Sequence, residues 1–94
     1  MNTITKEKLE KYFSITGEAI EKAKLSSNRT NLNSEREDFM DMISRYYSDA
    51  QHFFSKGDYV NAFAALNYAH GWLDAGARIG IFDVKDSRLF TVDD

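Results

Sequence analysis

Cysteine is absent from this chain of 94 residues, and no run of apolar residues is longer than Ala62 to Leu66. Without cysteine there is no disulfide framework, no thiolate metal site and no thiol nucleophile. Five apolar residues fall far short of the roughly 20 that a membrane-spanning helix needs, so we expect no membrane contact. The first six residues also lack the apolar core of a secretory signal, which predicts a cytoplasmic protein.

Positive charge is scarce in the larger part of the chain. The formal net charge is −3, and residues 34–94 carry six Lys or Arg against eleven Asp or Glu. Duplex nucleic acid would be repelled by most of such a surface, so we do not expect it as a partner. Apolar residues make up 43% of the chain, which is enough for one modest core, and residues 1–94 are therefore predicted to form a single domain.

The first two predicted helices are amphipathic. Residues 5–25 place their apolar side chains within an arc of about 120°, which is the stripe of a surface helix that packs on a core. Residues 26–33 are rich in Ser and Asn and predict a loop. Ser34 and Glu37 have the spacing of a capping box, which predicts a second helix over 34–56 with an aromatic-rich apolar face.

A tight turn joins the second helix to the third. Gly57 can adopt the left-handed conformation that ends a helix, and Asp58 can cap a following helix over residues 59–79. So short a turn forces the two helices into an antiparallel hairpin. We therefore predict an all-α three-helix bundle, with the N-terminal helix packed on this hairpin. The apolar tail 80–94 is expected to fold over one end in extended form, with a short strand at Leu89 to Val92.

The helix predicted over residues 59–79 is apolar around about 240° of its circumference, which is more than one packing partner can cover. Such a helix lies either between two segments of its own chain or between its own chain and a second copy. Gly71 and Gly76 each cost up to about 1 kcal/mol relative to alanine in a helix interior, so close packing or ligand contact is expected there. The surplus apolar surface predicts a homodimer.

A narrow polar strip interrupts this apolar surface and supplies the candidate binding residues, which are Asn67, His70, Asp74 and Arg78. A carboxylate one helical turn from a histidine can orient the imidazole, so His70 with Asp74 could act as a general base, and Arg78 could hold an anion. The same row is also what an ordinary solvated helix face looks like. Both interpretations stay open at this point.

Arg45 and His52 form a second candidate pair on the polar face of the helix 34–56. Their spacing is compatible with the Arg and His pair of helical ribonucleases, in which the arginine stabilises phosphate and the histidine activates a hydroxyl. Asp49 lies three residues before His52, but two ligands do not make a metal site. We therefore predict neither a metal nor a cofactor.

The hairpin also resembles a known family. The residues that carry the resemblance are Tyr46-Tyr47, Ala50, Gly57-Asp58-Tyr59, Ala62, Tyr68-Ala69, Gly71, Asp74-Ala75 and Ile81-Phe82. They are similar to the uncharacterised archaeal proteins called domain of unknown function 357. The similarity spans residues 4 to about 92 and is specific in the stretch from Gly57 to Gly76, but loose in the first helix and the tail. The resemblance implies a small all-helical archaeal protein and brings no established activity.

From these features we expect a non-enzymatic protein–protein interaction module that self-associates through the helix 59–79, alone or with an unidentified protein partner. The alternative is a helical ribonuclease or nucleotide-binding enzyme of the kind found in toxin–antitoxin systems, to which the Gly-Asp-Tyr turn also bears a likeness. In that group the Arg and His pattern falls on a late helix, whereas here it precedes the hairpin turn.

Overall fold

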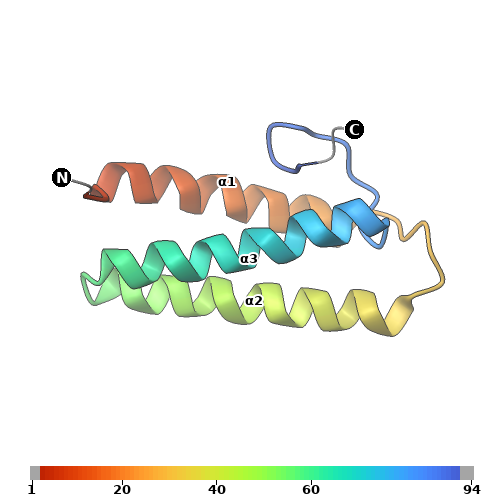
Figure 1. Cartoon of the computed structure of the whole chain (residues 1–94), viewed down its shortest axis with the longest axis horizontal. Helices are drawn as coiled ribbons and strands as arrows, with labels where there is room; N and C mark the ends of the chain where they lie inside the picture. The colour runs from red at the N-terminus through yellow and green to blue at the C-terminus, as the bar shows by residue number, and fades with distance from the viewer. Residues whose placement is uncertain (1–2, 92–94) are drawn as a thin grey trace.

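The computed structural model describes residues 3–91, which form three helices and a C-terminal tail (Figure 1). Helix α1 spans Lys6–Leu25, α2 spans Asn33–Ser55 and α3 spans Tyr59–Ile79. The predicted all-α class is confirmed, and the part of the chain that the structure describes contains no strand. In Figure 1, α3 runs between α1 and α2, and it contacts both of them.

The turn between α2 and α3 has the predicted chemistry. Gly57 has a φ of 76°, in the left-handed region where a residue without a Cβ is favoured. The side chain of Asp58 accepts a hydrogen bond of 3.2 Å from the backbone N–H of Asn61 and so caps α3. The antiparallel hairpin is therefore confirmed.

Alanines on α3 allow the neighbouring helices to approach closely. Ala62 and Ala69 are completely buried, and each belongs to one of two hydrophobic clusters that divide the core along its length. The cluster near the hairpin turn includes Leu9 of α1, and the cluster at the other end includes Leu73 and the fully buried Phe82. Since both clusters contain side chains of α3, this helix is the central element of the bundle.

The start of α2 differs from the prediction, and the capping box at Ser34 is wrong. The helix begins at Asn33, its N-cap is Leu32, and no side chain caps it. Ser34 lies within the first turn and donates to the carboxylate of Glu35 instead. The chain enters α2 through a turn in which the hydroxyl of Thr30 accepts from the backbone N–H of Leu32, so the helix begins one residue earlier than expected.

Arg36 joins three segments at this end of the bundle. Its guanidinium donates to the carbonyl oxygens of Ala23 at 3.2 Å and of Ser26 at 2.8 Å, both at the C-terminal end of α1. It also donates to the carbonyl of Ile81 and lies 5.3 Å from the ring centre of Phe82. A cation at the end of a helix satisfies carbonyls that have no partner within the helix, so Arg36 fixes α1, α2 and the tail together.

The tail leaves α3 at Gly80, whose φ is 93°, and folds back over α1 and α3. Leu89 and Phe90 are both 2% exposed, and their backbone N–H groups donate to the carbonyl of Asp86. This bonding closes a turn at 87–89, so the expected strand does not form at residues 89–91. Val92, the last residue of that predicted strand, lies outside the described residues.

Candidate functional site

One face of α3 is left uncovered by the rest of the described chain. This agrees with the wide apolar arc predicted for the helix 59–79, which is more than one neighbour can bury. We name this uncovered face the open face, and all its members are exposed and uncharged: Val60, Ala64, Asn67, Tyr68, Gly71, Ala75 and Ile79. The side chains of Val60 and Tyr68 are the most exposed large ones, at 70% and 62%. A surface helix ordinarily carries charged residues on its solvent side, so this face is unusual.

A groove of about 610 Å³ lies on the open face, lined by five of its residues together with Trp72 of α3 and Phe39 of α2. Its aromatic lining residues are Phe39, Tyr68 and Trp72; Phe39 meets Trp72 edge to face at 4.8 Å, and Tyr68 stacks on Tyr46 of α2 at 5.3 Å. The groove is open at Gly71, where an added Cβ would have no atom of the described chain within 4 Å. The structure therefore presents a shallow, mostly apolar depression flanked by rigid aromatic rings.

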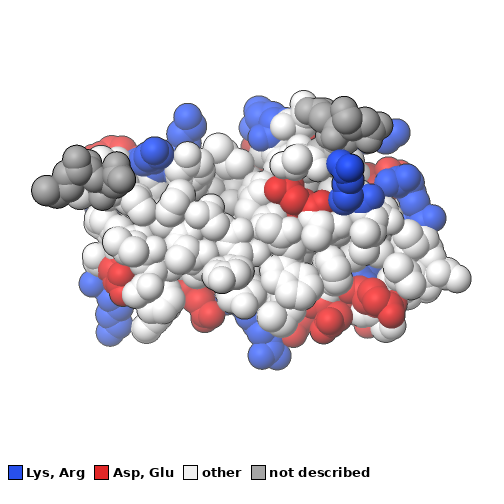
Figure 2. Space-filling model, viewed as in Figure 1, with Lys and Arg blue, Asp and Glu red and all other residues white. Residues whose placement is uncertain are grey.

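Charged side chains are arranged around this surface rather than on it. Figure 2 shows a wide band without Lys, Arg, Asp or Glu that runs along the middle of the molecule, with most of the charges at its edges. An apolar area bordered by polar groups is typical of a protein interaction site.

The predicted polar strip does not remain one continuous row. His70 lies under the tail, with Nε2 at 2.6 Å from the carbonyl oxygen of Leu89 and Nδ1 at 3.0 Å from the hydroxyl of Thr16. A carbonyl oxygen can only accept, so Nε2 carries a hydrogen, and in the neutral ring Nδ1 accepts from Thr16. Both ring nitrogens of His70 are thus engaged in holding α1 and the tail against α3.

Asp74 also contacts the tail. Its two carboxylate oxygens accept from the backbone N–H of Thr91 at 2.8 Å and from the Thr91 hydroxyl at 3.3 Å, while Nε2 of His70 is 4.0 Å away. Asn67 instead lines the groove, and Arg78 is exposed near the C-terminal end of α3. The strip therefore divides into a tail contact and the edge of the open face, and its binding role stays a prediction.

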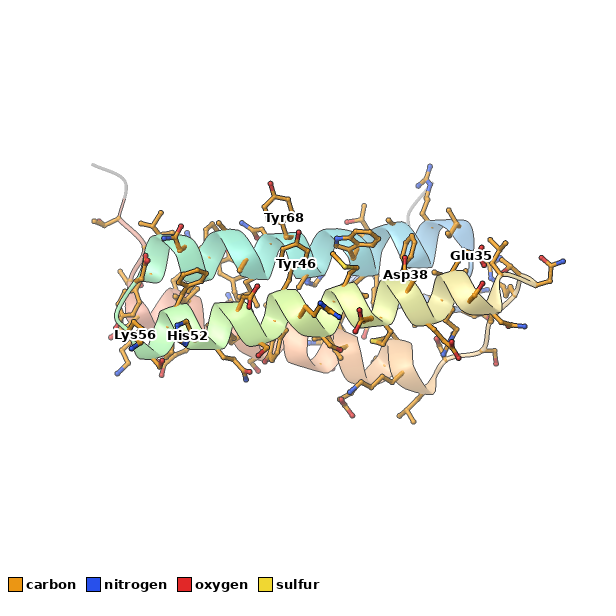
Figure 3. The ribbon with its side chains drawn as sticks, turned by 90° about the horizontal axis from the view of Figure 1, so that it is seen from below. Glu35, Asp38, Tyr46, His52, Lys56 and Tyr68 are labelled. Carbon is orange, nitrogen blue, oxygen red and sulfur yellow. The ribbon has the colours of Figure 1, made fainter. Side chains whose placement is uncertain are left out.

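The second candidate pair is spread along α2. Arg45 and His52 are seven residues apart, which is about 10 Å along a helix axis, and both are exposed. The Nε of Arg45 donates to the Asp41 carboxylate at 2.9 Å, and His52 lies against the ring of Phe53. Lys56 follows His52 by four residues, one turn further along, and both are exposed (Figure 3), but Arg45 pairs with Asp41 two turns away, so the predicted Arg45–His52 pair does not form a compact site.

The open face was not named residue by residue from the sequence, although a signal for it exists. Val60, Ala64, Gly71 and Ala75 recur at spacings of four and seven residues without a charge, while the buried alanines fall between them. A row of uncharged residues at helical spacing, next to a row of buried residues, predicts that the helix has a further contact surface besides those packed on its two neighbours.

The described residues contain neither a cluster of three or more His, Asp or Glu that could hold a metal ion nor a helix of the length and apolarity required to cross a membrane.

Fold and surface together define a small three-helix protein whose central helix presents an uncharged face. The family model described as "Protein of unknown function (DUF357)" matches residues 11–82, and the chain belongs to that family. The match covers all of α2 and α3 and most of α1. No curated protein and no solved structure matches the chain.

Proposed function

We propose that this protein is a non-enzymatic interaction module that self-associates through the open face of α3. The observation that carries the proposal is an exposed, uncharged helix face with an apolar groove on it and two aromatic pairs beside it. Burial of such a surface is favourable because apolar area leaves water, and it leaves no charge without a partner. The proposal retains the expected cytoplasmic location and archaeal source.

The area of the open face determines the expected affinity of self-association. From Val60 to Ile79 it extends for about 28 Å, at 1.5 Å per residue. With a width of about two helix diameters, roughly 20 Å, two copies would bury about 1,100 Å² in total, near the lower limit for specific interfaces. We therefore expect a reversible dimer with a dissociation constant in the micromolar range.

Sedimentation velocity over a concentration series from about 1 μM to about 500 μM tests the proposal. The expected result is a concentration-dependent shift from the mass of one chain, 10.8 kDa, to twice that mass. Ala75→Glu should abolish the shift because it places a carboxylate without a partner in the interface. Since Ala75 is exposed and glutamate is a good helix former, the monomer should remain folded.

Gln51→Glu is the matched control, because it adds the same charge on an exposed position of α2 that faces α1 rather than the open face. This variant should dimerise like the unmodified protein. A monomer at every concentration would overturn the proposal. Equal loss of the dimer in Gln51→Glu and Ala75→Glu would overturn it too, since the effect would then come from net charge.

The ribonuclease alternative is tested separately by incubating the protein with single-stranded RNA. Cleavage that is lost in His52→Ala would support it. Cleavage that persists in both His52→Ala and His70→Ala would come from a contaminant, and an absence of cleavage would remove this alternative.

A further inference from the structure

We propose that the second copy binds antiparallel, α3 against α3, about a two-fold axis that passes α3 between Ala69 and His70, so that the Tyr68 side chain of each copy enters the hole beside Gly71 of the other. This inference rests on the proposed self-association and specifies its geometry. Two-fold symmetry is the commonest way in which two identical chains close an interface.

The distribution of residue sizes on the open face supports this arrangement. In an antiparallel pair, residues equally far before and after the axis come level with one another. Ala64 then lies level with the partner's Ala75, and Val60 with the partner's Ile79. These pairs place a small residue opposite a small one on either side of the axis, and larger side chains at the two ends, where crossing helices diverge and leave more space.

The centre of the face combines a large side chain with a hole. Tyr68 projects from the surface with 62% of its area exposed, whereas the space above Gly71 is empty to 4 Å in the described chain. In knobs-into-holes packing, four residues at positions i, i+3, i+4 and i+7 of one helix receive one side chain of the other helix. On α3 these positions are Tyr68, Gly71, Trp72 and Ala75. The partner's Tyr68 fits this hole, with Gly71 and Ala75 as its floor.

The presence of glycine at position 71 also supports contact with a second copy. Glycine is unfavourable in a helix interior relative to alanine, and at Gly76 the close approach of the Phe82 ring explains why no larger residue is present. No such contact exists at Gly71 within residues 3–91. A side chain from a second copy would supply it.

Charges on α2 distinguish antiparallel from parallel pairing. Figure 3 shows Glu35 and Asp38 near one end of α2 and His52 and Lys56 near the other, with Tyr46 and Tyr68 between them. Because α2 packs beside α3, antiparallel copies bring the acidic end of one α2 towards the Lys56 end of the other. In a parallel two-fold pair the two α2 helices would lie on opposite sides of the α3 pair, so this contact between their ends would not form.

Engineered cysteines test the direction, and the natural absence of cysteine makes the readout unambiguous. Ala64→Cys and Ala75→Cys are prepared as two separate proteins, mixed, and oxidised. In the antiparallel dimer Cys at 64 meets the partner's Cys at 75, so only the mixture should form a disulfide-linked dimer. Within one variant, the equivalent positions would be about 16 Å apart, beyond the roughly 7 Å that a disulfide spans.

A charge exchange provides a second, independent readout. Lys56→Glu should raise the dissociation constant of the dimer about five- to tenfold at low salt, because the attraction between Lys56 and the partner's Glu35 is lost and this pair occurs twice in a symmetric dimer. Adding Glu35→Lys to that variant should restore the dissociation constant. Lys11→Glu, on exposed surface of α1, makes the same charge change and should have no comparable effect.

The outcomes separate this inference from the proposal on which it rests. A dimer that is lost in Ala75→Glu but forms disulfides within each single-cysteine variant would overturn the antiparallel arrangement and leave self-association intact. A chain that is monomeric at all concentrations would overturn both. Cross-linking confined to the mixture, together with restoration by the exchanged charges, would establish the antiparallel pair.

Discussion

Replacing Gly76 with alanine tests how tightly the tail is packed on α3. A Cβ at this position would lie 2.4 Å from two carbon atoms of the Phe82 ring and 3.4 Å from Ile81. The ring is fully buried, so it has no open space into which it can turn. It would have to move by about 1 Å to restore an ordinary carbon–carbon separation of about 3.5 Å or more.

Two opposing effects determine how much Gly76→Ala changes the free energy of unfolding. Overpacking of a buried site typically costs about 1–3 kcal/mol, and this contact lies at the severe end of that range. Alanine gains up to about 1 kcal/mol over glycine in a helix interior. Gly76→Ala should therefore lower the free energy of unfolding by about 2 kcal/mol. Gly71→Ala, whose Cβ meets no atom within 4 Å in the described chain beyond the helix's own backbone, should raise it by about 1 kcal/mol.

Urea denaturation followed by circular dichroism measures both changes. Each variant carries Ala75→Glu, so that self-association does not contribute to stability through mass action. A Phe82→Leu substitution in the Gly76→Ala protein should reduce the cost of the alanine, because it removes part of the ring that the new methyl group meets. Equal stability of Gly76→Ala and the unmodified protein would refute the packing described here, and so would destabilisation by Gly71→Ala.

Three further measurements test other contacts. Arg36→Ala should lower the free energy of unfolding by about 2–3 kcal/mol in urea, and Arg36→Lys by less, because carbonyls of separate segments lose a charged donor. A hydrogen bond from Arg88 lowers the pKa of Glu18 from its ordinary value of 4.5. A lowered pKa in the folded state stabilises the docked tail above that ordinary value. This stabilisation is lost as the pH falls below 4.5 and through the lowered pKa, so the protection factors of the tail amides in hydrogen exchange should decrease over that range. Burial raises the pKa of Tyr47 above 10.0, so the last step of a tyrosine absorbance titration should disappear in Tyr47→Phe.

Local sequence features predicted the elements that depend on local interactions. Gly57 and Asp58 determine the hairpin turn through their own backbone and side-chain bonds, and α3 has the predicted bounds. The start of α2 depends instead on contacts between segments. Arg36 binds the end of α1, and the loop at Thr30 supplies its own hydrogen bonds, so the nearby Ser34 does not act as the cap.

The tail shows why the polar strip could not be interpreted from spacing alone. The helical spacing of His70 and Asp74 is the same whether they face water, a ligand or another part of the chain. The tail lies against them because Leu89 and Phe90 bury their side chains in the core, and that places the Leu89 carbonyl and the Thr91 N–H within hydrogen-bonding distance. This contact depends on packing between distant segments, which no local pattern reports.

Gly71 and Gly76 illustrate the same limit within a single helix, and they connect the fold to the proposed interaction. From the sequence, both are glycines in a helix interior, and both predict close packing or contact with a ligand. The structure provides a contact for Gly76, since the Phe82 ring occupies the position of its missing side chain. The space above Gly71 is open among residues 3–91, on the face of α3 that the described parts of the other helices and of the tail leave uncovered. The same physical argument that a contact within the chain satisfies at Gly76 is the basis on which we propose a contact from a second copy at Gly71, and the exposed Tyr68, three residues away, is a side chain of suitable size for it.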